Sequence, residues 1–239
     1  MIGRIILATL IAGLCAGLIM GGIQHFRLTP LITEAEIYEK AQDAKDATKS
    51  ACVETMPGHT MCNGDEAGWQ PQEGWQRTAF TTISTMIAGA GFALLMAGIS
   101  FVSGIKINRT NALIWGVCGF IAVSLAPAAG LPPEVPGMPI ADLTSRQIWW
   151  VFTILSTGLG LWLIAAKPRA WAPYLAIFAF ALPHVFGAPV AMPHETQVPP
   201  NLAAEFVANS LAANAIFWAL IGLFLAQAFH YLEEKYPTP

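Results

Sequence analysis

Long apolar stretches alternate with short polar connections along the whole chain. Six such stretches stand out, at residues 5–25, 79–103, 111–131, 148–166, 171–187 and 203–230. Each is close to the roughly 20 residues that an α-helix needs to cross about 30 Å of hydrocarbon. The pattern predicts an all-α integral membrane protein with about six transmembrane helices. We expect a single membrane domain over 1–239, with an extracytoplasmic loop inserted between the first two helices over 27–78.

The composition indicates that lipid, rather than water, surrounds most of the chain. Hydrophobic residues make up 55% of the 239 positions and charged residues only 11%, whereas an ordinary soluble domain carries about 25% charged residues. So few charges cannot cover the surface of a soluble fold of this size. The chain has no run rich in Lys and Arg, and its formal net charge is -3. Both features argue against nucleic acid as a partner.

The first apolar stretch is expected to be a retained helix rather than a cleaved signal peptide. It is longer than the usual signal core, and no small-x-small cleavage site closes it cleanly. Gly13, Gly17 and Gly21 recur at four-residue spacing, which places them on one helix face. Such a face lets the backbone of a neighbouring helix approach closely.

Basic residues in the short connections fall on one side of the membrane if there are six spans. They are Arg4, Lys106, Arg109, Lys167, Arg169 and Lys235. Because cytoplasmic loops hold the excess of Lys and Arg, both termini are predicted to be cytoplasmic, in a bacterial inner membrane. Thirteen of the fifteen carboxylates then face the outer side. Either this charge concentrates cations there, or it only reflects the retention of basic residues inside.

Histidines gather on the same outer side, some of them near carboxylates. Imidazole is a good ligand for divalent first-row metals, and a carboxylate beside it suits cobalt, nickel or zinc. Ionisable residues inside membranes, such as His184, are usually functional, although an interfacial packing role for any single histidine stays open. The candidate metal ligands are His25, Glu34, Glu36, Glu39, His184, His194 and Glu195.

The last apolar stretch carries a polar face. Glu205 and Asn209 lie four residues apart, and Asn214 pairs with Ser210 at the same spacing. The side chains of Glu205, Asn209 and Asn214 either line a pore or form interhelical hydrogen bonds.

Proline and glycine cluster where the third and fifth spans leave the membrane, at 126–134 and 182–189. Prolines there free backbone carbonyls, which are tolerated only where they line a cavity or are buried in protein. Interrupted segments at corresponding positions point to a binding site, while ordinary Pro-capped exit loops are the simpler alternative. The likeness of the two clusters also hints at repeated helical hairpins.

Cys52 and Cys62 both lie in the long outer loop. In an oxidising compartment, a disulfide between them is the favoured interpretation. Met56, His59 and Met61 lie in the same loop, so a soft-metal site is an alternative, although no CxxC spacing supports it.

The motifs of common enzyme classes are missing. The chain contains no GxxxxGK[ST] loop, HExxH, GxSxG or Rossmann glycine pattern. We therefore expect no enzymatic activity and no tightly bound cofactor. A transporter built on this chain would draw its energy from an ion gradient, the membrane potential or a partner.

Six further segments are distinctive in combination. They are residues 29–39, 125–137, 141–143, 146–150, 182–184 and 202–220. Together they resemble the CbtA family of predicted cobalt transporter subunits, and the resemblance runs essentially end to end. It implies a small inner-membrane protein linked to cobalt supply for cobalamin synthesis. It also implies a CbtB-type partner with one span and a histidine-rich metal-binding end.

Two functions compete for this chain. The first is a membrane subunit for uptake of a divalent metal cation, with cobalt or nickel as the transported ion. The second is a non-transporting scaffold in a larger membrane complex, because the glycine-rich first span suits packing against other helices. The sequence does not fix whether the chain also forms a homo-oligomer.

Overall fold

The computed structural model of the chain is built from helices. It describes residues 2–49, 71–165, 169–192 and 196–236. Every regular element within those ranges is a helix, so the predicted all-α class is confirmed. Eight residues named above lie outside the described residues, namely Cys52, Met56, His59, Met61, Cys62, Lys167, His194 and Glu195.

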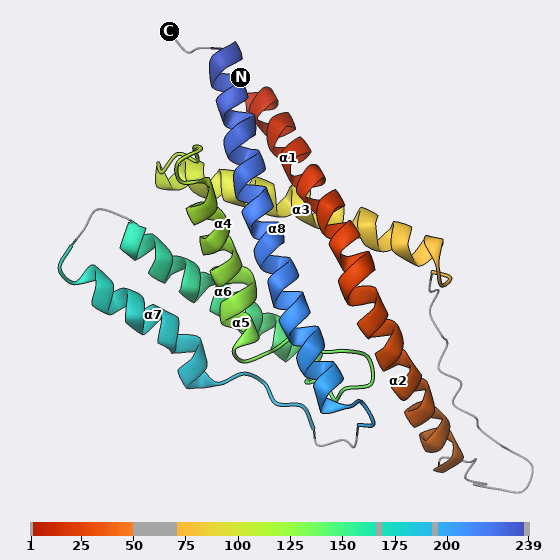
Figure 1. Cartoon of the computed structure of the whole chain (residues 1–239). Coiled ribbons are helices and arrows are strands. Elements are labelled where there is room, and N and C mark those ends of the chain that lie inside the picture. The colour runs from red at the N-terminus through yellow and green to blue at the C-terminus, as the bar shows by residue number, and fades with distance from the viewer. Residues whose placement is uncertain (1, 50–70, 166–168, 193–195, 237–239) are drawn as a thin grey trace, which may run out of the picture.

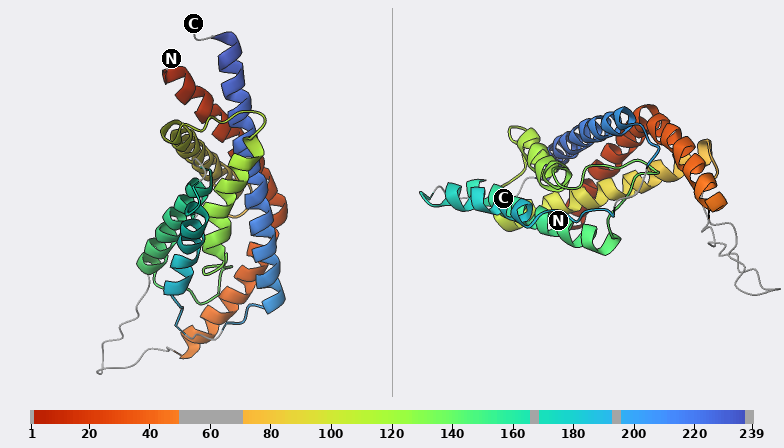
Figure 2. Two further views of the ribbon diagram at one scale, coloured as in Figure 1. Left: turned by 90° about the vertical axis from the view of Figure 1, so that its left-hand side faces the viewer. Right: turned by 90° about the horizontal axis from the view of Figure 1, so that it is seen from below.

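The helices run back and forth between two ends of the molecule. In chain order they are α1 (Ile2–Ile23), the π-helix η1 (Gln24–Leu28), α2 (Thr29–Lys49), α3 (Trp75–Ser103), α4 (Ala112–Phe120), the π-helix η2 (Ile121–Leu125), α5 (Ala126–Ala128), α6 (Leu143–Ala165), α7 (Ala172–Phe186) and α8 (Pro200–Lys235). Both termini lie at the same end (Figures 1 and 2). An even number of crossings requires that arrangement.

Four of these helices are long and apolar enough to cross a membrane. They are Ile2–Lys45, Trp75–Ser103, Leu143–Ala165 and Pro200–Lys235. The chain is therefore a multi-pass membrane protein. Two more apolar helices, Ala112–Ala128 and Ala172–Phe186, are shorter. At 1.5 Å per residue they cover about 25 and 22 Å, less than the roughly 30 Å of the hydrocarbon core.

The segment predicted as a loop over 27–78 begins as a helix. Helix α2 continues α1 through η1 as far as Lys49, and α3 already starts at Trp75. The drop in hydropathy after Arg27 ends the apolar stretch, but it does not end the helix. Residues 34–49 are rich in Ala, Glu and Lys, which are strong helix formers.

Helices α1 and α3 pack closely through the three glycines of α1. A Cβ atom on Gly17 would lie 2.6 Å from the carbonyl oxygen of Thr85, and one on Gly21 would lie 2.8 Å from the Thr82 side chain. A Cβ atom on Gly13 would overlap the backbone of α3 at Ala90. The close backbone approach predicted from the four-residue spacing is confirmed.

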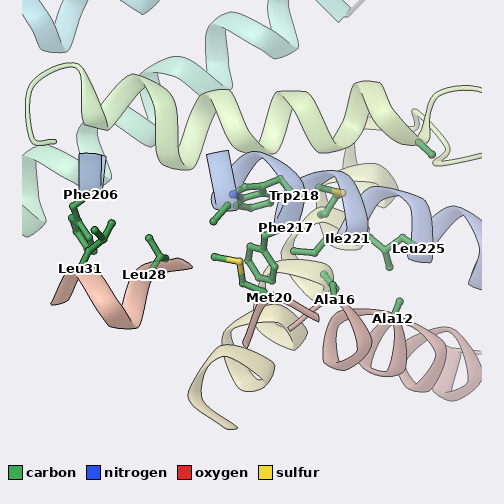
Figure 3. Close-up of a cluster of buried hydrophobic side chains, with 14 of the residues drawn as sticks. Ala12, Ala16, Met20, Leu28, Leu31, Phe206, Phe217, Trp218, Ile221 and Leu225 are labelled. Atoms are coloured by element: carbon green, nitrogen blue, oxygen red, sulfur yellow. The ribbon is translucent and has the colours of Figure 1, made fainter. Parts of the chain in front are cut away.

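Helix α8 is the centre of the bundle, since α1 packs on one side of it and α4 on the other (Figure 1). The α4 contact is close as well, because a Cβ atom on Gly116 would lie 2.6 Å from the carbonyl oxygen of Trp218. Ile221 and Leu225 of α8 are fully buried against Ala16 of α1, and Figure 3 shows this core.

The remaining pair, α6 and α7, packs together beside α4 and η2. Successive spans are therefore not always packed partners, because α4 lies along α8 and not along α3 or α6. Helices α4 and α6 meet mainly through η2 and α5. The repeated hairpins suggested by the sequence stay a prediction.

Candidate functional site

Both π-helices sit just before a proline. The η1 segment ends two residues before Pro30, and η2 ends two residues before Pro127. Proline has no N–H to donate to the carbonyl of the preceding turn, so the backbone there departs from regular α-geometry. π-Bulges inside helices are frequently found at functional sites, and both of these lie against α8.

The η1 segment ties α1 to α3 and α8 through polar side chains. Arg27 donates from Nη2 to Oδ1 of Asn209 on α8, at 3.0 Å. The Thr85 hydroxyl donates to Oε1 of Gln24 at 2.7 Å, and His25 Nδ1 lies 3.2 Å from the Thr78 hydroxyl. Asn209 therefore makes an interhelical hydrogen bond, one of the two roles that the sequence leaves open for it.

The predicted acidic ligands on α2 differ in their surroundings. Both carboxylate oxygens of Glu36 accept hydrogen bonds from Arg77 at the start of α3, one of them at 3.0 Å. Glu34 is exposed, and Glu39 is half-buried beside Gly137 of the α5–α6 loop. A metal ion that used Glu36 would therefore have to displace an arginine.

His184 lies on the opposite side of the bundle from His25. It is exposed near the end of α7, and its ring centroid is 5.9 Å from that of Trp149 on α6. Trp149 is itself fixed by a hydrogen bond from Nε1 to the carbonyl oxygen of Pro183, 3.2 Å away. Since η1 packs against α8 and hydrogen-bonds to α3 while α7 packs against α6, each imidazole belongs to a different helix pair.

A cavity of about 410 Å³ opens where η2, α5, α6 and α8 come together. Much of its wall is apolar, with Pro127, Pro132 and Pro133 among the lining residues. Its polar lining residues are Ser124, Arg146, Gln147 and Asn214. The cavity lies at 126–134, the first of the two Pro/Gly clusters that the sequence marked as pointers to a binding site.

Two of the polar lining groups are held by hydrogen bonds. Asn214 donates from Nδ2 to the carbonyl oxygen of Ser210, at 2.9 Å, which leaves its amide oxygen as the free acceptor. The Ser124 hydroxyl accepts a hydrogen bond from Nε1 of Trp218, at 3.2 Å. Both groups are therefore oriented before any ligand arrives.

The charge of Arg146 at the cavity is balanced by a carboxylate. Arg146 Nη2 lies 2.8 Å from Oε2 of Glu134, and both side chains are largely buried. Just before α6, the backbone N–H and the hydroxyl of Ser145 donate to Oδ2 of Asp142. These two bonds hold the pKa of Asp142 below its ordinary value of 3.8, as expected for a helix N-cap carboxylate.

The structure brings together only some of the predicted site residues. Among the described residues, no three His, Cys, Asp or Glu side chains form a group that could hold a metal ion. Asn214 does line the cavity, whereas Glu205 is exposed on the first turns of α8. Sequence reasoning missed Ser124 and Gln147, which only the packing of α5 and α6 brings to the cavity.

Comparison with known protein families matches residues 2–230 to the CbtA family, described as probable cobalt transporter subunits. Comparison with curated proteins finds no match, and neither does comparison with solved structures. The family match covers nearly the whole chain, including every helix that lines the cavity. The chain belongs to the CbtA family.

Proposed function

We propose that this protein is the membrane subunit of an uptake system for a divalent metal cation, with cobalt as the preferred ion. It acts in a bacterial plasma membrane with both termini in the cytoplasm, and the ion it supplies serves cobalamin synthesis. The proposal draws on the family, whose members are described as probable cobalt transporter subunits. It extends that description to an ion, a direction and a compartment.

The observation that carries the direction of transport is the opposite charge of the two ends. Among the residues whose side chains the structure describes, the end away from the termini carries eight carboxylates and five cationic side chains. The end that holds the termini has five cationic side chains and two carboxylates. An acidic outer end raises the local concentration of cations, and an inside-negative potential favours their entry by about 2.3 kcal/mol per charge per 100 mV.

At the terminal end, two arginines contact uncharged side chains. The Arg4 guanidinium lies 3.9 Å from the ring centroid of Tyr236, and Arg109 donates to Oε1 of Gln227 at 2.8 Å. Excess positive charge at one end is what the positive-inside rule expects of a cytoplasmic face.

The predicted ligands enter this proposal as a first capture step. Glu34 and Glu39 gather the ion, and His25 and His184 each replace one of its water molecules. His194 and Glu195 belong to the same predicted set. Since His25 and His184 belong to different helix pairs, neither imidazole alone removes more than one water from the ion.

Cobalt accumulation in cells that lack other uptake systems tests the proposal. Cells that express this chain with its CbtB-type partner are expected to accumulate cobalt, and His184→Ala is expected to lower that accumulation. A matched control is His230→Ala, because His230 lies on α8 at the terminal end and contacts Glu234 there. Equal uptake by cells with and without the chain would contradict the proposal, and unchanged uptake by His184→Ala at equal membrane abundance would remove His184 from it.

A second candidate function is a scaffold that assembles other membrane subunits. A groove of about 610 Å³ between α3 and α6 favours it, because its lining is almost entirely apolar and includes Gly91, Gly98 and Trp162. A Cβ atom on either glycine would meet nothing within 4 Å, so this face is open to lipid or to another helix.

Reconstitution of the purified chain alone in liposomes separates the two functions. Metal-dependent flux supports transport, and its absence with stable co-purification of other subunits supports the scaffold.

A further inference from the structure

We infer that the cavity between η2, α5, α6 and α8 binds one phospholipid, with the phosphate of its headgroup on Arg146 and an acyl chain along the apolar wall. Such a lipid is a bound structural component, separate from any ion that the chain transports. The site therefore goes beyond the proposed function.

Arg146 supplies the charge at the cavity. Among the described residues that line it, Arg146 alone is charged. Its Nη2 donates to Oε2 of Glu134 at 2.8 Å, and Glu134 itself does not line the cavity. That bond uses one of the five N–H donors of a guanidinium, and Glu134 is the one acceptor that contacts Arg146 among the described residues. The other donors are left for an anion, and the planar fork of arginine matches the oxygens of a phosphate group.

The neutral polar residues of the lining add further donors. The Ser124 hydroxyl accepts from Nε1 of Trp218 at 3.2 Å, so its own proton is left to donate. The amide of Asn214 has a second N–H besides the one that donates to Ser210, and the amide of Gln147 also lines the cavity. The phosphate and ester oxygens of a phospholipid accept hydrogen bonds, so they require donors of this kind.

The rest of the wall suits a hydrocarbon chain. Apart from the four polar residues, the lining is apolar. Two of its large side chains, Leu143 and Trp150, are 65% and 38% exposed, so this wall borders the surface of α6 that faces lipid. Tryptophan is enriched at the level of lipid headgroups. A phospholipid covers this apolar wall, whereas a free phosphate ion leaves it bare.

The size of the cavity favours a lipid over another helix. A sphere of about 410 Å³ is about 9 Å across, narrower than the roughly 10–12 Å of an α-helix with its side chains. An acyl chain is much thinner than a helix, so it enters where a helix does not fit.

A lipid in this cavity joins two parts of the bundle. Helix α6, which carries Arg146, packs on α7, while α8 packs on α1 and α4. A ligand that contacts α6, η2 and α8 together holds the α6–α7 pair against the rest of the molecule. Because a ligand that binds only the folded state stabilises it by mass action, its binding is measurable as a higher melting midpoint.

The test is native mass spectrometry of the purified full-length chain in detergent with three probes, followed by thermal melts. Dioleoyl phosphatidylglycerol is expected to be retained as one molecule per chain and to raise the melting midpoint. Dioleoylglycerol has the chains without the phosphate, so it is expected to bind at least about tenfold more weakly, the effect of losing a hydrogen bond to a charged group. Inorganic phosphate has the charge without the chains and is expected not to displace the lipid. Equal affinity for dioleoylglycerol, or displacement by inorganic phosphate, overturns the inference.

Charge variants separate lipid binding from a structural role of the ion pair. Arg146→Gln is expected to weaken phosphatidylglycerol binding at least about tenfold. Glu134→Gln is expected to strengthen it about threefold, the effect that Coulomb's law gives in water when one of two like unit charges about 6 Å apart is removed. A purely structural salt bridge would lower the melting midpoint in both variants without moving their lipid affinities apart.

Two more variants guard this comparison. Arg109→Gln removes a cationic side chain at the terminal end and is the matched control, with lipid retention expected to stay unchanged. Leu211→Trp fills the cavity without touching the ion pair, since Leu211 is a lining residue, and it is expected to abolish retention. Undiminished retention by Leu211→Trp, or lipid affinities of Arg146→Gln and Glu134→Gln that change in the same direction, overturns the inference.

Discussion

The contact between α1 and α3 makes a sharp prediction about Gly17→Ala. The added methyl would lie 2.6 Å from the Thr85 carbonyl oxygen and 2.9 Å from the Met86 amide nitrogen, where ordinary contacts are 3.4–4 Å. Since these are backbone atoms of a helix, they cannot turn away, and α3 has to move outward by about 1 Å. A gap of that size forfeits about a quarter to a half of the dispersion attraction between atoms in contact.

These terms give a net destabilisation of about 1–2 kcal/mol. Overpacking a close contact typically costs about 1–3 kcal/mol, and Ala recovers up to about 1 kcal/mol as a better helix former than Gly. A thermal melt of the purified protein in detergent is expected to show a midpoint about 2–8 °C lower. Gly22→Ala is the matched control on the same helix, because its Cβ would meet nothing within 4 Å. Equal midpoints for the two variants would refute the packing argument.

Two further variants probe the outer end. Arg77→Gln is expected to cost about 1–2 kcal/mol, because Glu36 is left largely buried without its cationic partner. The melt should recover in part when Glu36→Gln is added, and no recovery would show that the pair does not act as a unit. Asp142→Ala removes the acceptor for both Ser145 bonds. Since the pKa of Asp142 is lowered in the fold, the difference in melting midpoint should be present at pH 6 and shrink as the pH falls below 3.8.

Hydropathy alone located the helices, because each apolar stretch has to be long enough to satisfy its backbone within lipid. Hydropathy did not predict α2, which continues α1 beyond the apolar stretch. Residues outside the lipid need not be apolar to form a helix, so the apolar pattern ends before the helix does. The glycine spacing predicted a close contact on one face of α1, because small residues at four-residue intervals let another helix approach. It did not predict that α3 is the partner. No comparable local signal marks Gln147, whose place at the cavity depends on how α6 meets α8.

The candidate site shows the same division between local and long-range information. Asn214 was identifiable because its spacing from Ser210 lies within one helix. His25 and His184 share a predicted side of the membrane, but that shared side says nothing about which helices pack together. The structure puts them on different helix pairs. If both act on one ion, they therefore act in successive steps and not as ligands in one coordination sphere.

The two short helices lie on the same side of the bundle as the cavity. The segment from α4 to α5 lines the cavity and α7 packs on α6 behind it, and these are the two helices shorter than the hydrocarbon core. A short hydrophobic helix is matched by local thinning of the bilayer. The main barrier to a cation is the loss of its hydration in a medium of low dielectric constant. We therefore expect the bilayer to be thinnest beside these two short helices, and a thinner bilayer shortens the distance over which that barrier acts.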